Sequence, residues 1–286
     1  MSNMILAYGN LAEAATLTGG SWVDTLPLTN LQNRQLDDVA RSVSLDPAAT
    51  QFTAAFSTPR LVRVLALVKH NAGVLGRRRF VLSSTADFST IVHDSGWEDI
   101  WPTVYPFGSL PWGSPSFWTG KYSAEQIAAF GGAPMVYILP QSMNAQYLRV
   151  EIDDQTNPAG YFQAGRLFVA DGWQPIRNFR WGSSLSWENR TEVQEALSGA
   201  EYFNARQARR IARFDLPSMS ESEGMAQAFD LQQSVGVSKE VLFIFDPEDT
   251  VHAIRRRFLG RLRTLNPIEN PGVDRWRSPF EISELL

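Results

Sequence analysis

The chain of 286 residues contains no cysteine and only three histidines. Because thiols are absent, disulfides, thiol catalysis and thiolate metal sites are all excluded. The histidines, His70, His93 and His252, lie far apart in the sequence, and no GxSxG, HExxH or phosphate-loop glycine pattern accompanies them. We therefore expect no catalytic residues, no metal and no cofactor.

Adjacent acids keep one enzymatic alternative open. A glycan hydrolase needs two carboxylates at a set separation, and the sequence has neighbouring acids at Asp37 and Asp38 and again at Glu98 and Asp99. Such pairs are common on the surface of any soluble protein, and a sequence does not place two acids at the required distance. We predict that the protein is not an enzyme.

Long apolar runs and a strong charge of one sign are also missing. The net charge is −4, divided as −3 before residue 176 and −1 after it, so neither half has the basic surface of a nucleic-acid-binding protein. No apolar stretch approaches the ~18 residues that span a bilayer, and the first residues show no secretory signal. We expect no specific nucleic-acid binding, no membrane insertion, and synthesis in a cytoplasm.

Residues 1–175 have the pattern of an all-β region, with many short strands and frequent turn residues that favour a β-sandwich or jelly roll. The clearest signal lies in residues 148–175. Leu148, Val150 and Ile152 alternate with polar residues, a polar turn follows, and a second strand runs over 161–170 with Gly165 as a candidate bulge. We predict a hairpin that closes an N-terminal domain at residue 175.

The turn of this hairpin contains Asp153, Asp154 and Asn157, whose side-chain oxygens are of the kind that calcium prefers. Their spacing is not that of an EF-hand. A polar turn accounts for them without a metal, so we expect no metal site here.

An aromatic insert occupies residues 97–122, where four prolines block a regular helix or central strand. A loop of this length is uncommon unless it has a function. Its side chains would contact a protein partner, form a small core beneath the loop, or stack on a glycan. As the partner- or glycan-binding loop we predict Trp97, Trp101, Tyr105, Trp112, Phe117, Trp118 and Tyr122.

Residues 176–286 have an α+β pattern. Strands are expected over 177–187 and 201–216, and a helix is expected to begin at the capping box of Ser220 and Glu223 and to stop at Gly236. An apolar strand over 241–245 follows. The chain as a whole is therefore expected to be mainly β, with an N-terminal sandwich and a C-terminal α+β domain.

Arginine dominates the basic residues, since lysine occurs only at Lys69, Lys121 and Lys239. Arginine forms planar multidentate pairs that suit packed interfaces, although a GC-rich genome gives the same bias. Two clusters stand out, and intersubunit ion pairing is favoured over phosphate contacts or a solvated face because apolar residues interleave with them. The predicted ring interface consists of Arg206, Arg209, Arg210, Arg213, Arg255, Arg256, Arg257, Arg261 and Arg263.

Several segments resemble known families. Residues 26–42, 63–71 and 148–175 resemble the discoidin-like (coagulation factor 5/8 type C) jelly-roll domains of bacteriophage tail proteins, and residues 179–199, 240–249 and 255–268 with the final FEISEL are similar to the ring-forming domain of distal tail proteins. The aromatic insert departs from a minimal jelly roll, and the disulfide common between discoidin termini cannot form here.

The resemblance implies a structural protein of the tip, or baseplate, of a long flexible phage tail. In that case the C-terminal domain would form a hexameric or trimeric ring of copies of itself, and the partners would be tail-tube and hub or fibre proteins of the virion, assembled in the host cytoplasm. The alternative is a carbohydrate-binding module for host-surface glycan, with host attachment as its role.

Overall fold

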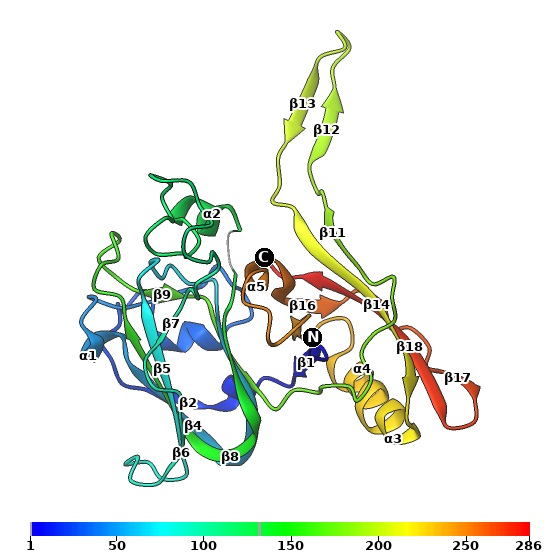
Figure 1. The fold of residues 1–286 in the computed structure, drawn as a ribbon, viewed down its shortest axis with the longest axis horizontal. Helices are drawn as coiled ribbons and strands as arrows, with labels where there is room; N and C mark the ends of the chain where they lie inside the picture. Colours follow the sequence, from blue (N-terminus) through cyan, green and yellow to red (C-terminus); the bar gives the residue numbers. More distant parts are fainter. Residues whose placement is uncertain (1, 131–132) are drawn as a thin grey trace. The chain divides into compact units, whose positions relative to one another are not determined.

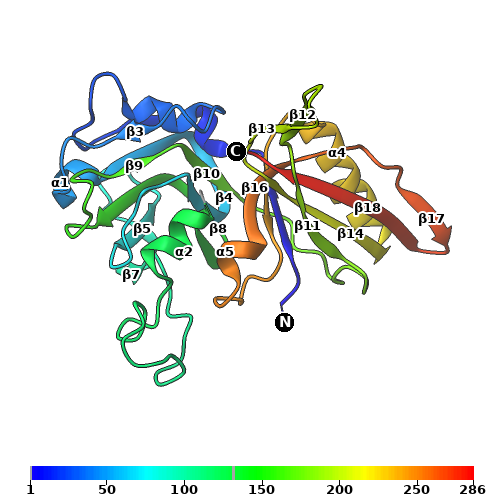
Figure 2. The same cartoon turned by 90° about the horizontal axis from the view of Figure 1, so that it is seen from above.

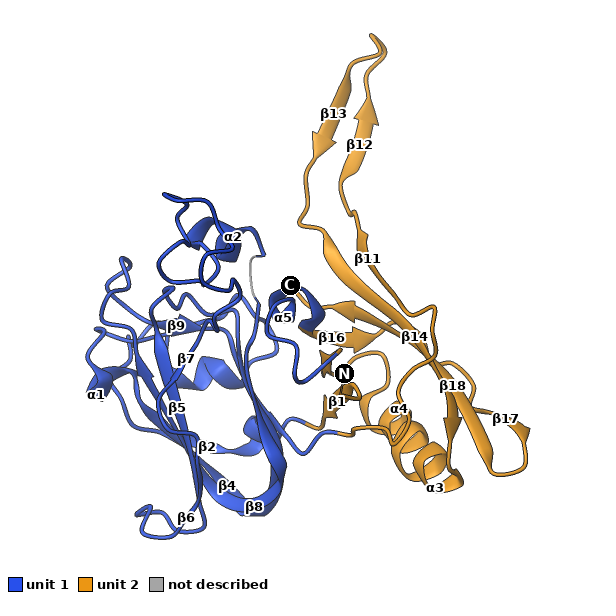
Figure 3. Cartoon of the chain, viewed as in Figure 1, with its two compact units in different colours: residues 1, 10–172, 246–257 blue, residues 2–9, 173–245, 258–286 orange. Residues whose placement is uncertain are grey.

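The computed structural model describes residues 2–130 and 133–286, which form two compact units (Figure 3). Unit 1 comprises Asn10–Gly172 and Asp246–Arg257, and unit 2 comprises Ser2–Gly9, Trp173–Phe245 and Phe258–Leu286. Both units are built on antiparallel sheets. The predicted mainly β class is confirmed.

Two short segments lie outside the expected ranges of 1–175 and 176–286. Strand β1 (Ile5–Tyr8) pairs with β15 (Val241–Ile244) in the sheet of unit 2, and Asp246–Arg257 belongs to unit 1, where the buried Ile254 packs into the core. Both departures depend on contacts between residues more than 100 positions apart. Local patterns in the sequence carry no signal for such contacts.

The main sheet of unit 1 has the order β10-β4-β8-β5-β6. These strands are Arg166–Ala170, Phe52–Val68, Met135–Asp153, Arg77–Ser83 and Ile91–Asp94. Figure 1 labels β4, β8, β5 and β6, and Figure 2 labels β10. At its edges β2 (Thr16–Thr18) pairs with β4 and β7 (Glu98–Asp99) pairs with β5, while β3 (Ala40–Arg41) and β9 (Gln163–Ala164) form a separate ribbon. The short helices are η1 (Leu11–Ala14), η2 (Leu28–Gln32), α1 (Pro47–Thr50), α2 (Ala124–Ala129) and α5 (Ala253–Arg256).

The predicted hairpin of residues 148–175 is wrong in its pairing, although both strands exist. Strand β4 lies between β8 and β10 and pairs with each. The turn that follows β8, here called the crossing turn, therefore leads past β4 to its other side, and β8 and β10 are not paired as a hairpin. Gly165 is not a bulge within one strand but the break between β9 and β10, and its N–H donates to the carbonyl of Val68 at 3.0 Å. A Cβ at this glycine would lie 2.3 Å from the carbonyl oxygen of Leu36.

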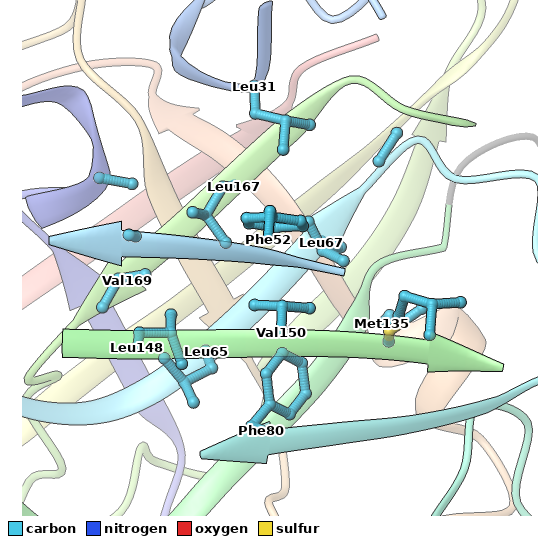
Figure 4. Packing of buried hydrophobic residues seen from close by; sticks show 14 of the residues in the cluster. Leu31, Phe52, Leu65, Leu67, Phe80, Met135, Leu148, Val150, Leu167 and Val169 are labelled. Atoms are coloured by element: carbon cyan, nitrogen blue, oxygen red, sulfur yellow. The ribbon is translucent and has the colours of Figure 1, made fainter. Parts of the chain in front are cut away.

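The core of unit 1 forms from the alternating side chains of its long strands. Leu148, Val150 and Ile152 are fully buried, as their alternation predicted. Figure 4 shows Leu148 and Val150 in the same cluster as Phe52 and Phe80 from the neighbouring strands. This apolar core fixes the strand ends and the loops that leave them.

The sheet of unit 2 has the order β1-β15-β16-β18-β14-β11, with β17 (Glu269–Gly272) paired to β18. The remaining strands are β16 (Arg257–Leu262), β18 (Arg275–Glu284), β14 (Arg209–Met219) and β11 (Ser184–Glu188). A helical segment packs on the sheet and consists of α3 (Glu221–Glu223), the π-helical η3 (Gly224–Phe229) and α4 (Asp230–Val235).

The predicted ends of this helical segment are confirmed. The Ser220 hydroxyl accepts a hydrogen bond from the Glu223 N–H at 3.2 Å, and the Glu223 carboxylate reaches back to the Ser220 N–H. Gly236 follows the last turn with a φ of 57°, a conformation that favours glycine.

A hairpin that we call the arm replaces part of the expected long strands. The strand expected over 201–216 is divided into β13 (Glu201–Asn204) and β14, and β13 pairs with β12 (Glu192–Glu195) in a two-stranded ribbon. Figure 1 shows this ribbon extending beyond β11 and β14. All residues of β12 and β13 are exposed. Within the described residues, the helices are all too short or too polar to cross a membrane.

Candidate ligand-binding site

The aromatic insert divides into a buried part and an exposed part. Trp101 and Tyr122 are only 6% and 2% exposed and belong to the core of unit 1. Tyr105 and Phe117 are half-buried, Trp97 is 37% exposed, and Trp112 and Trp118 are 80% and 75% exposed. The insert therefore forms both a small core and an exposed loop, which the sequence had offered as alternatives.

Polar contacts explain why Trp101 and Tyr122 turn inward. The Trp101 indole N–H donates to the carbonyl of Ala72 at 3.2 Å, and the Tyr122 hydroxyl donates to the carbonyl of Val251. Arg255 donates to the same hydroxyl at 3.2 Å. Burial raises the pKa of Tyr122, so the hydroxyl stays neutral and keeps its donor. These two residues are therefore not part of the exposed surface of the insert, and their role in binding stays a prediction.

The exposed part is a group of touching rings that we call the aromatic tip: Phe107, Trp112, Phe117 and Trp118. Trp112, Phe117 and Trp118 meet edge to face with ring centroids 5.1–5.5 Å apart, and Phe107 lies 6.4 Å from Phe117. In Figure 2 the loop between β7 and α2, which carries the tip, projects from unit 1. Each ring is oriented by its neighbours; Phe107, Trp112 and Trp118 are largely exposed to solvent, and the half-buried Phe117 lies against all three.

The inner part of the insert lines a cavity of about 450 Å³, here called cavity 1. Its wall combines β5, β7 and β8 with the 246–257 segment, and it includes Trp101 and Tyr122. This volume is within the range of roughly 300–1,000 Å³ that is usual for small-ligand sites. The polar and aromatic members of the wall used below are Arg78, Glu98, Asp99, Trp101, Tyr122 and Tyr137.

Arg78 is the central donor of cavity 1. Its Nη1 donates to the carbonyl of Val136 at 2.8 Å, and its Nη2 lies 3.6 Å from a carboxylate oxygen of Glu98. Its buried Nε–H finds no hydrogen-bond acceptor among residues 2–130 and 133–286. Burial lowers the pKa of Arg78 to about 10, and nearby Arg257 adds to this effect while Glu98 opposes it. The guanidinium is charged at neutral pH, and it retains one unmatched donor.

Two carboxylates accompany this guanidinium. The side chains of Glu98 and Asp99 are 43% and 46% exposed, so they are accessible from solvent. Asp99 pairs at 2.9 Å with Lys121, whose buried ammonium also donates to the carbonyl of Val74. Strand β7 pairs with β5 so that Glu98 lies opposite Arg78 and Asp99 lies opposite Arg77, and both acids line cavity 1. The pairing places hydrogen-bond acceptors and a donor along one wall.

Aromatic rings supply the rest of this wall. Tyr137 stacks on Phe80 with centroids 5.7 Å apart, and its hydroxyl is 2.7 Å from Nε2 of His93. Trp101 and Tyr122 are fixed by the hydrogen bonds described above. The wall of cavity 1 therefore offers hydrogen bonds to the hydroxyl groups of a small ligand and aromatic rings to its apolar face.

A second cavity of about 560 Å³, here called cavity 2, lies within the same unit. Trp101 and Ala133 line both cavities. The β4–β5 loop, helix α2 and the crossing turn after β8 form the rest of its wall, which includes His70, Ala72, Ile127, Ala128, Asn157 and Pro158.

The crossing turn is anchored by its own polar side chains. Oδ2 of Asp154 accepts hydrogen bonds from the Gly73 N–H and from Nδ2 of Asn157, both at 2.8 Å, and Nδ2 of Asn157 also donates to the carbonyl of Asn71. Burial raises the pKa of Asp154. Within the described residues no group of three or more histidine, aspartate or glutamate side chains is placed to hold a metal ion.

The nine arginines predicted at a ring interface all make contacts within the chain. Arg255, Arg256 and Arg257 lie in unit 1, whereas Arg261 and Arg263 lie in unit 2, so the second cluster is divided. Ion pairs join Arg206 to Glu192, Arg209 to Glu188, Arg210 to Glu284, Arg213 to Glu281, Arg256 to Asp249, and Arg263 to both Glu188 and Glu281. Arg255 contacts the Tyr122 hydroxyl, and Arg257 and Arg261 donate to backbone carbonyls. Their role between subunits stays a prediction.

Sequence reasoning missed several residues of the two cavities. Arg78, Tyr137 and His70 were not singled out for binding, because each stands in a strand or loop whose pattern is that of ordinary β structure. The one signal in the sequence was the pair of acids Glu98 and Asp99 at the start of the aromatic insert. That signal did not reveal Arg78, which faces these acids only through the pairing of β5 with β7.

Comparisons with known proteins give no family for the chain. No family model matches it, and no curated protein matches it. Among solved structures, it is similar to a CBM32 module from a family 31 glycoside hydrolase of Clostridium perfringens, with a TM-score of 0.37 and 9% identity over 57% of this chain and 98% of that chain.

Two further solved structures are similar in the same way. The lectin binding domain of Lectinolysin complexed with Lewis b has a TM-score of 0.37 and 14% identity over 58% of this chain and 97% of that one. Chitosan-binding module 1 of a chitosanase/glucanase from Paenibacillus sp. IK-5 has a TM-score of 0.36 and 15% identity over 57% and 98%. At these scores the three likenesses carry no argument about function. The phage tail-tip expectation gains no support from them and stays a prediction.

Proposed function

We propose that unit 1 is a carbohydrate-binding module in which cavity 1 takes a sugar residue. The observation that carries the proposal is the meeting of a guanidinium, two accessible carboxylates and three aromatic rings in one cavity of about 450 Å³. Sugar hydroxyls both donate and accept hydrogen bonds. The carboxylates of Glu98 and Asp99 accept them, and the unmatched Nε–H of Arg78 donates.

The aromatic side chains complete this chemistry. A pyranose ring has faces of C–H groups that pack on aromatic rings, and Trp101, Tyr122 and Tyr137 line the same cavity. The aromatic tip extends the surface available to a longer glycan. Binding requires no chemical step, in keeping with the prediction that the protein is not an enzyme.

The test is a glycan-array screen of the full chain, followed by calorimetric titration with the saccharides that bind. Glu98→Gln keeps the shape of the side chain but removes its charge, and we expect at least tenfold weaker binding. Asp87→Asn is the matched control, because Asp87 is an exposed acid outside the cavity wall. The proposal fails if the protein binds no glycan, or if both variants bind as tightly as the unaltered chain.

A second candidate function is self-assembly through the arm, as the expected tail-tip ring would require. The observation that favours it is the exposure of Val193, Tyr202 and Phe203 on the two strands of the arm and of Leu197 in the turn between them. Large apolar side chains exposed together are typical of interaction surfaces.

Light scattering across a concentration series, with negative-stain imaging, tests this second function. We expect a closed ring with a central hole, and we expect the paired change Tyr202→Ser and Phe203→Ser to abolish it. A monomer at every concentration, alone and with tail-tube or hub protein, would remove the ring from consideration. Loss of the ring with glycan binding retained would separate the two functions.

A further inference from the structure

Cavity 2 differs from cavity 1 in the chemistry of its wall. Ala72, Val74, Ile127, Ala128 and Pro158 give it apolar surfaces, and Trp101 forms a shared aromatic side. Lys69 also lines it, but this ammonium already pairs with Asp37. The wall therefore suits a neutral ligand with a small apolar group.

The imidazole of His70 lines cavity 2 and carries a buried hydrogen-bond donor. Nδ1 of His70 accepts the Ala72 N–H at 3.2 Å, so in the neutral ring the proton is on Nε2. This Nε2 is buried and has no hydrogen-bond partner within the described chain. Burial, with a smaller effect from Arg78, lowers the pKa of His70 to about 4, so the ring is neutral at pH 7.

The orientation of this ring is fixed from two sides. Besides the bond from Ala72, the ring contacts Trp101 with centroids 5.4 Å apart, and Trp101 is itself bonded to the carbonyl of Ala72. A buried N–H without an acceptor costs free energy, because water hydrogen-bonds the same group in the unfolded chain. A ligand that brings a carbonyl oxygen to Nε2 recovers that free energy.

We propose that cavity 2 is a second glycan subsite that selects an acetamido group, with its carbonyl oxygen accepting from His70 Nε2–H and its methyl group against the wall formed by Ile127 and Ala128. An acetamido group is neutral, has one strong acceptor and ends in a methyl group, which matches the donor, the apolar wall and the absence of a spare charge. A free hydroxyl at the same sugar carbon offers no methyl group and fills less of the cavity. The subsite rests on the proposed carbohydrate binding and names the class of sugar: N-acetylated hexosamines.

The test compares N-acetylglucosamine and N-acetylgalactosamine with glucose and galactose by calorimetric titration of the full chain. We expect each N-acetylated sugar to bind at least tenfold more tightly than its parent hexose. Ala128→Phe should remove this preference, since the added ring occupies the cavity from the exposed face of α2. Ala129→Phe is the matched control, because Ala129 is exposed on the same helix but does not line the cavity. Equal binding of the four sugars would overturn the subsite.

A probe without a sugar separates this inference from the proposed function. The chain has three histidines, so ¹⁵N-histidine labelling yields a spectrum simple enough to assign with His93→Gln and His252→Gln. N-methylacetamide should shift the His70 Nε2 signal and leave the other two unchanged, and Ala128→Phe should abolish the shift.

Each result of this probe decides between the two proposals. No shift at His70 overturns the acetamido subsite, even if glycans bind at cavity 1. A shift at His70 together with no binding of any sugar overturns the proposed function, and it also overturns the assignment of cavity 2 to a glycan. A shift accompanied by the N-acetyl preference supports both.

Discussion

Arg210 of unit 2 and Arg78 of unit 1 are both buried, but they differ in how far the fold satisfies their hydrogen-bond donors. In unit 2, Arg210 is bonded to Glu284 through Nε, Nη2 and its own backbone N–H, and both side chains are almost fully buried. In unit 1, Arg78 has a carboxylate only at 3.6 Å and keeps an unmatched Nε–H beside a cavity. The first arginine is satisfied within the fold, whereas the second has bonding capacity left for a ligand.

The largest loss of stability is expected when Glu284, the partner of Arg210, is replaced. Glu284→Ala leaves the buried guanidinium of Arg210 without its partner, and we expect the free energy of unfolding to fall by about 3–5 kcal/mol. Glu281→Ala is the control, because its partners Arg213 and Arg263 are considerably exposed, and it should cost no more than about 1 kcal/mol. Urea denaturation measures both. Equal losses would show that the Arg210 pair is no more important than a surface pair.

Arg78→Met should separate binding from stability. Methionine has a similar volume and removes both the charge and the unmatched donor, and Glu98 is exposed enough to stay hydrated. The lost hydrogen bond to the Val136 carbonyl should lower the free energy of unfolding by about 1–2 kcal/mol, less than the loss at Glu284. Glycan binding at cavity 1 should nevertheless be lost. Denaturation and titration of the same preparation check this. A large loss of stability would mean that Arg78 is a structural residue, like Arg210.

The buried carboxyl of Asp154 should make the stability of unit 1 depend on pH. Its pKa is raised by burial, so the folded state binds the proton more tightly than the unfolded state does. The free energy of unfolding should then fall as pH rises from the unfolded pKa of about 3.9 through the higher folded value, and Asp154→Asn should remove this component. The difference in unfolding free energy between the two proteins, measured from pH 3 to pH 7, gives the result. A difference that is constant with pH would contradict it.

The smallest effect on stability is expected at the aromatic tip. Trp118→Ala removes an exposed ring, so we expect a change within about 0.5 kcal/mol in the free energy of unfolding and weaker binding of long glycans. Trp97→Ala is a control from the same insert but outside the tip. If Trp118→Ala destabilised unit 1 strongly, the tip would be a small core and not a binding surface.

The fold class and several local elements were predictable from the sequence because their causes are local. The alternation of Leu148, Val150 and Ile152 and the capping box of Ser220 depend on residues a few positions apart, and both were confirmed. The hairpin of 148–175 was predicted wrongly because alternation identifies a strand but not its neighbour. Only the pairing of β4 with both β8 and β10 decides that.

The candidate site was predictable only in part for the same reason. The aromatic insert was identified by its composition, but its division into buried and exposed rings depends on distant acceptors, the carbonyls of Ala72 and Val251. Arg78 and His70 acquire their unmatched donors from the arrangement of loops around them. No spacing in the sequence reports such an arrangement.

The path of the chain between its two units has a consequence for how the protein can be made. Strand β1 finds its partner only when residues near Ile244 exist, and the core of unit 1 is incomplete until Ile254 has been added. Neither unit can therefore finish folding on the ribosome before most of the chain has been translated. Contacts of such long range slow folding and leave apolar strands exposed in the meantime. A gene fragment ending at residue 175 would encode β1 without its partner β15 and a unit 1 core without Ile254. Either unit is therefore best expressed within the whole chain.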